Sequence, residues 1–70
     1  MPEVIQDLLQ REPFAPFRII TTGGDSYDVT HANLVAMGQS WIFYCYPRSD
    51  RFVFIPYNQV SSVEKLPAAA

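Results

Sequence analysis

The chain has few of the residues with which small domains reinforce their fold. Its 70 residues include one cysteine, Cys45, and one histidine, His31. A single cysteine excludes an internal disulfide. A metal site normally needs three or four Cys, His or carboxylate ligands at workable spacing, and no carboxylates cluster beside these two residues. We therefore expect no disulfide, no structural metal and no cofactor.

Charge is also scarce. Five Lys and Arg residues against seven Asp and Glu give a net charge of −2. Nucleic-acid-binding domains usually carry a basic excess, so this balance argues mildly against RNA or DNA as the partner. The sequence has no run of 18 apolar residues and no basic segment followed by an apolar one, so we expect neither a membrane span nor a signal peptide. A cytoplasmic location is the default, and an unpaired cysteine agrees with it.

Self-association is the remaining route to stability. A domain of this length buries only about 60% of the surface that its unfolded chain exposes, and small domains compensate with disulfides, a metal or a partner subunit. The first two are not expected here. An apolar fraction of 49% with 14% aromatic residues is generous for a monomer of this size. We therefore expect a homo-oligomer.

The pattern of apolar residues predicts one domain over residues 1–70, made of a short helix followed by strands. Val4, Ile5, Leu8 and Leu9 recur at helical spacing, which indicates a helix over residues 1–11, and the prolines at 13 and 16 then favour a stiff connector. From residue 17 the period changes to two. The predicted strands cover 17–21, a long bent segment from 26 to 37, 41–46, 51–55 and 60–66, with a one-turn connection at 56–59 and a frayed tail at 67–70.

The third and fourth predicted strands carry large apolar groups on both faces. Trp41, Phe43 and Cys45 alternate with Ile42, Tyr44 and Tyr46, and the next strand alternates in the same way. One face can line a barrel, whereas the other needs the helix or a second subunit, because exposed two-sided apolar strands aggregate. The candidate oligomer interface is Tyr44, Tyr46, Phe52 and Phe54.

The order of these elements resembles that of the small five-stranded Sm-like barrels. Residues 7–29 (DLLQREPFAPFRIITTGGDSYDV) are similar to the helix end, connector and first hairpin of bacterial Hfq-type proteins, and residues 55–66 (IPYNQVSSVEKL) are similar to their connection and last strand. The chain more closely resembles a set of small bacterial proteins of unknown function that share the Pro-Phe-x-Pro-Phe-Arg-Ile entry, a His-centred corner and a final Ser-x-Glu strand. The resemblance implies a mainly β fold, a five-stranded antiparallel SH3-like or Sm-like barrel with an N-terminal helix.

The same resemblance implies RNA binding as an alternative function. In Sm-like proteins the connection before the last strand carries basic or asparagine side chains that meet RNA. Pro56, Tyr57 and Asn58 stand at the matching positions here, and of these Asn58 agrees with an asparagine used in some of the family. The Lys-His or Arg-Gly pair of the family is missing, and its rim arginines are reduced to Arg11 beside Glu12.

A few side chains are candidates for binding. His31, at a strand corner, could handle a proton or contact a base, although a hydrogen bond to nearby backbone is the favoured interpretation. Tyr57, with Tyr44 and Tyr46 and with Arg48 and Arg51, could stack on bases and meet phosphates. Subunit interfaces are enriched in the same residue types, and we favour an interface. Cys45 is interpreted as a packing residue.

No catalytic constellation is present, so we expect a non-enzymatic binding or assembly module. The favoured hypothesis is a homo-oligomer that acts through protein contacts, with itself and possibly with another protein. The alternative is an Sm-like RNA-binding protein, with Tyr57, Asn58, His31, Arg48 and Arg51 as the candidate binding residues.

Overall fold

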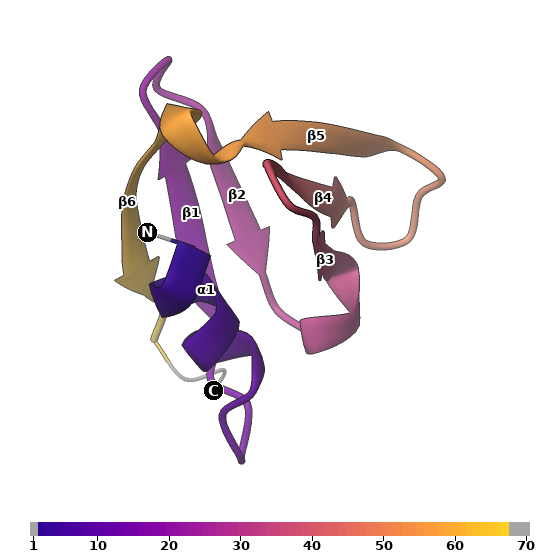
Figure 1. The fold of residues 1–70 in the computed structure, drawn as a ribbon. Coiled ribbons are helices and arrows are strands. Elements are labelled where there is room, and N and C mark those ends of the chain that lie inside the picture. Colours follow the sequence, from indigo (N-terminus) through magenta and orange to yellow (C-terminus); the bar gives the residue numbers. More distant parts are fainter. Residues whose placement is uncertain (1, 68–70) are drawn as a thin grey trace.

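Over residues 2–67 the fold is mainly β, with one short helix and two antiparallel sheets of three strands each. The computed structural model describes residues 2–67 (Figure 1). The elements in chain order are α1 (Pro2–Leu9), β1 (Phe17–Thr21), β2 (Ser26–Val29), the 3-10 turn η1 (Ala32–Leu34), β3 (Val35–Met37), β4 (Trp41–Cys45), β5 (Phe52–Pro56), the 3-10 turn η2 (Tyr57–Gln59) and β6 (Val60–Lys65). Most of the predicted tail, residues 68–70, and the first residue of the predicted helix lie outside the described residues.

Helix α1 is amphipathic and packs through one stripe. Pro2 is favourable in the first turn, where its missing N–H costs nothing, and Glu3 lies near the positive end of the helix dipole. Ile5 is fully buried, whereas Val4 beside it is 49% exposed. The helix ends at Leu9, two residues before the predicted end, and no helix among residues 2–67 is long and apolar enough to cross a membrane.

The first sheet has the strand order β2-β1-β6. The β1–β2 hairpin turns at Gly24, whose φ of +91° lies in the left-handed region that favours glycine, and the Thr21 N–H donates to the Asp25 carbonyl over 2.9 Å. Phe17 and Ile19 alternate into the core along β1, and both are fully buried.

The second sheet has the order β3-β4-β5, with β4 in the centre. Ile42 on β4 is paired with Ile55 on β5, and both side chains are buried. The connection from β5 to β6 is the single turn η2, in the place where the sequence predicts a one-turn connection.

The structure corrects the expectation of a five-stranded barrel. The long bent strand predicted over 26–37 is divided by η1 into β2 and β3, because the Leu34 N–H bonds back to the His31 carbonyl at 3.2 Å and takes this segment out of the ladder. Residues 2–67 consequently hold six strands, which form two separate sheets and no closed barrel.

The core lies between the two sheets and the helix. The hydroxyl of Tyr44 donates to the carbonyl of Asp28 at 2.7 Å and ties the second sheet to the edge of β2. The Phe14 ring, from the connector after the helix, packs on Phe17 with ring centroids 6.0 Å apart. The buried side chains are Ile5, Leu8, Phe17, Ile19, Val29, Val35, Ile42, Tyr44 and Ile55.

Candidate functional site

Four aromatic side chains gather on the outward face of β4 and β5. Along each strand alternate residues point to opposite faces, so Trp41 and Phe43 on β4 lie on the same side as Phe52 and Phe54 on β5. Trp41 is 49% exposed, Phe52 56% and Phe54 54%, while Phe43 between them is half-buried. We call these four residues the aromatic patch.

The rings of the aromatic patch touch one another. The centroid of Phe43 lies 5.0 Å from that of Phe52 and 5.2 Å from that of Phe54, and the Trp41 and Phe54 centroids are 6.0 Å apart, nearly edge to face. The three most exposed rings leave on the order of 300 Å² of aromatic surface in water, if each offers about half of its area. Apolar surface of this size is comparable to the largest patch that a typical monomer exposes, and such patches are often functional.

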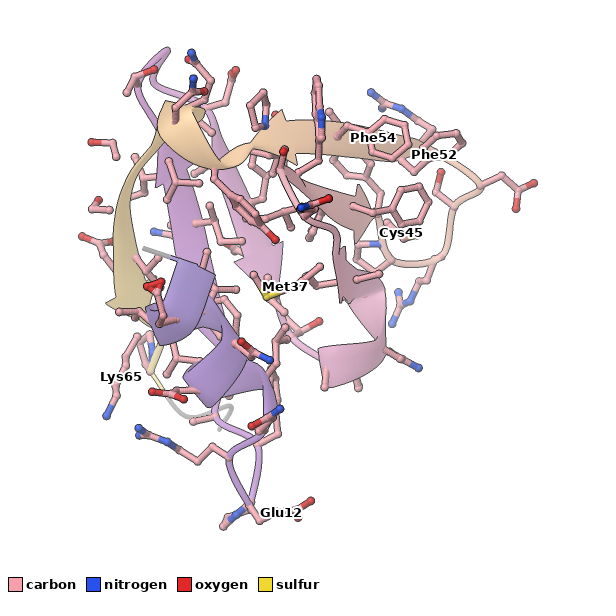
Figure 2. The ribbon with its side chains drawn as sticks, in the orientation of Figure 1. Glu12, Met37, Cys45, Phe52, Phe54 and Lys65 are labelled. Atoms are coloured by element: carbon pink, nitrogen blue, oxygen red, sulfur yellow. The ribbon has the colours of Figure 1, made fainter. Side chains whose placement is uncertain are left out.

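The helix does not cover the aromatic patch. Ile5 and Leu8 of α1 belong to the inner core instead. Figure 1 shows α1 against the first sheet, and Figure 2 shows Phe52 and Phe54 on β5, well away from the helix. The patch is therefore left to solvent or to another molecule.

The four residues predicted for an oligomer interface lie on two different faces. Phe52 and Phe54 belong to the aromatic patch, whereas Tyr44 is 3% exposed and forms part of the core. Tyr46 is half-buried, with its ring 5.2 Å from that of Tyr44, and the Arg51 guanidinium lies 4.8 Å above it. Trp41, which was not among the predicted interface residues, is in the patch because it shares the period-two face of Phe43.

The phenol groups of Tyr44 and Tyr27 have raised pKa values. Burial raises the pKa of Tyr44 above its ordinary value of 10.0, and the nearby charge of Asp28 raises it further. Burial also raises the pKa of Tyr27, followed by the influence of Tyr46. Both phenols are therefore neutral at neutral pH, and Tyr44 acts as a hydrogen-bond donor in the core.

Arg18 and Asp28 form a cross-strand ion pair between β1 and β2. The Arg18 Nε lies 2.7 Å from an Asp28 carboxylate oxygen, and this hydrogen bond is the main reason why the pKa of Arg18 is raised. Both side chains are on the solvent side of the sheet. Opposite charges directly across a strand pair favour the observed register. We therefore interpret this ion pair as stabilising the β1–β2 hairpin and not as part of a binding site.

Tyr57 and Asn58 lie together beside Trp41. An open hollow of about 400 Å³ is formed by residues from the β3–β4 turn, β4, the end of β5 and η2, namely Gln39, Ser40, Trp41, Pro56, Tyr57 and Asn58. The Tyr57 hydroxyl donates to the Gly38 carbonyl, which fixes the ring at the side of this hollow.

The other predicted binding residues lie elsewhere. His31 precedes η1, where its Nδ1 is 3.2 Å from the Thr30 hydroxyl, and Arg48 and Arg51 belong to the β4–β5 turn at the far end of β5 from η2. Arg48 adopts a left-handed φ of 60° in that turn. The five candidates for RNA binding therefore do not form one surface.

Within the described residues, no group of three His, Cys, Asp or Glu side chains could hold a metal ion. Cys45 is a half-buried free thiol on the same face of β4 as Phe43. Comparison of the chain with protein families, with curated proteins and with solved structures found no match.

Proposed function

We propose that this protein is a non-enzymatic assembly module that associates with further copies of itself. The observation that carries the proposal is the aromatic patch, in which three large rings stay about half exposed although the inner core is closed. The largest apolar patch of a small protein is often the surface through which it binds another molecule. The proposal keeps the cytoplasmic setting expected from the sequence.

An approximate free-energy balance predicts that self-association has a moderate affinity. Burying roughly 300 Å² on each of two copies contributes about 15 kcal/mol at ~25 cal/mol per Å². Association costs about 4–15 kcal/mol in lost freedom, and more in ordering side chains. Stable interfaces bury roughly 800 Å² per partner, so the aromatic patch supplies less than half of what a tight complex uses. The contact therefore needs a second contribution beyond the four rings.

Sm-like RNA binding is the second candidate function. The hollow beside Trp41 favours it, because a base could stack on the indole while Asn58 offers hydrogen bonds to its edge. The net charge of −2 disfavours it, as does the position of Arg51, which stacks on Tyr46 away from the hollow. The resemblance to Sm-like barrels that the sequence indicates is part of this second candidate function only.

Light scattering on a gel-filtration peak, with absorbance recorded for protein and for nucleic acid, tests both candidates. We expect a mass of two or more chains that falls on dilution, with the absorbance ratio of pure protein. A peak rich in nucleic acid that is lost as salt rises would instead support RNA binding. A monomer at every concentration would contradict self-association.

A further inference from the structure

Strand β5 has an open edge with unpaired backbone groups. It is the last strand of the second sheet, as Figure 1 shows. The Tyr46 N–H donates to the Arg51 carbonyl, and the Tyr57 N–H donates to the Ser40 carbonyl. The backbone groups of Arg51 and Tyr57 therefore face β4. Because the direction of these groups alternates along an antiparallel strand, the backbone of Val53 also faces β4, and that of Phe52 and Phe54 faces away from it. In the described part of the chain, no strand pairs with that outer side, although residues of the β1–β2 hairpin line a hollow with Phe54 and Pro56.

The other three sheet edges carry the features that discourage strand addition. Strand β3 has only three residues, and β6 ends in Glu64 and Lys65. On β2 the outward carbonyl of Asp28 already accepts the Tyr44 hydroxyl. Natural sheets are usually protected against the addition of a further strand by short edge strands, by charged side chains and by groups that cover the edge. Strand β5, with the sequence Phe-Val-Phe-Ile-Pro, has five residues and no charge.

We propose that β5 pairs antiparallel with β5 of a second copy, about a two-fold axis at Val53. This inference rests on the proposed self-association and gives it a geometry. A centre at Val53 places Phe52 opposite Phe54 of the other copy, so the outward N–H and C=O groups of both residues are satisfied in two reciprocal pairs. Pro56 has no N–H and falls outside these pairs, as a proline at the end of an edge strand can.

The arrangement adds backbone hydrogen bonds to contacts of the Phe52 and Phe54 rings, while Trp41 and Phe43 lie one strand away on β4. Pairing β5 with itself joins the two second sheets into one of six strands and brings the Phe52 and Phe54 rings of the two copies across from each other. The backbone bonds add to the ring contacts at the same edge. A second copy of the chain is the occupant that fits this edge. It carries the same uncharged strand and the same aromatic face, and a two-fold axis places the two strands in equivalent positions.

A cysteine at the axis tests this geometry. In Val53→Cys, made with Cys45→Ser so that no other thiol is present, the two new thiols belong to a non-hydrogen-bonded pair with Cα atoms about 4.5 Å apart. That separation is within the range for a disulfide. We expect mild oxidation to convert most of the protein to a covalent dimer. The matched control, Val63→Cys with Cys45→Ser, places a thiol at a half-buried valine on β6 and should stay monomeric on a non-reducing gel.

The outcomes separate this inference from the proposed function. If light scattering shows an oligomer but Val53→Cys does not cross-link, the two-fold β5 contact is wrong and self-association stands. Cross-linking only in a mixture of the Val53→Cys and Val63→Cys proteins would show head-to-tail pairing of β5 with β6 and would also overturn it. An adduct with a polypeptide of different mass would assign the edge to a foreign strand. A wild-type monomer at every concentration contradicts both proposals.

Discussion

Replacing Phe52 and Phe54 together by serine is expected to weaken self-association by about 10-fold or more. The two side chains are 56% and 54% exposed in the single chain, so the folded monomer depends on them little, while β5 pairing of two copies places the four rings in two cross-strand pairs. Each cross-strand pair of phenylalanine rings contributes roughly 0.5–1.5 kcal/mol, and about 1.4 kcal/mol corresponds to a tenfold change in affinity. Light scattering over a dilution series measures the shift.

The control for that variant is Val4→Ser on α1. Val4 is 49% exposed and apolar, but it lies on the helix, away from the aromatic patch. We expect the Val4→Ser protein to dissociate on dilution over the same concentration range as the wild type. Equal association of the double variant and the wild type would show that the copies meet on another surface.

Phe17→Ala is expected to remove most of the stability of the fold. Phe17 is fully buried at the start of β1, and truncating a buried phenylalanine costs about 3–5 kcal/mol. A domain of 70 residues has roughly 4–10 kcal/mol in total. Urea unfolding, followed at concentrations where the wild type is monomeric, should give a free energy of unfolding reduced by about that amount.

The same substitution at Phe52 provides the comparison. Because the Phe52 ring is 56% exposed, Phe52→Ala removes fewer contacts from the monomer, and we expect a loss below about 1.5 kcal/mol. Similar losses at the two positions would mean that the outward face of β5 is packed within the single chain, which would remove the basis of the aromatic patch.

Much of the fold could be predicted from local sequence patterns. The spacing of Ile5 and Leu8 indicates the buried stripe of α1, and the Gly-rich turn before residue 26 indicates the first hairpin. The division of the second predicted strand could not be foreseen. Residues 31–33 interrupt its alternation, but whether the chain bends or starts a new strand depends on pairing partners far away in sequence, such as β6 beside β1 and β4 beside β3.

The candidate site was predicted only in part, for a related reason. Alternation along β4 and β5 sorts the side chains into two sets, but both sets are apolar, so the sequence does not say which set faces inward. In the fold, Ile42, Tyr44 and Ile55 are buried in the core, and the Tyr44 hydroxyl bonds to the Asp28 carbonyl on β2, so this set faces inward. Phe52 and Phe54 are then outside, together with Trp41.

Amide hydrogen exchange at two protein concentrations tests most directly whether copies meet at the edge and outward face of β5. The Leu66 N–H bonds to the Pro16 carbonyl, so the backbone of Val63 and Lys65 faces outward on β6, in the same way as that of Phe52 and Phe54 on β5. We expect the Phe52 and Phe54 amides to exchange more slowly at high concentration, while those of Val63 and Lys65 do not change. Exchange at Phe52 and Phe54 that is independent of concentration, in a protein that light scattering shows to be associated, would contradict this account.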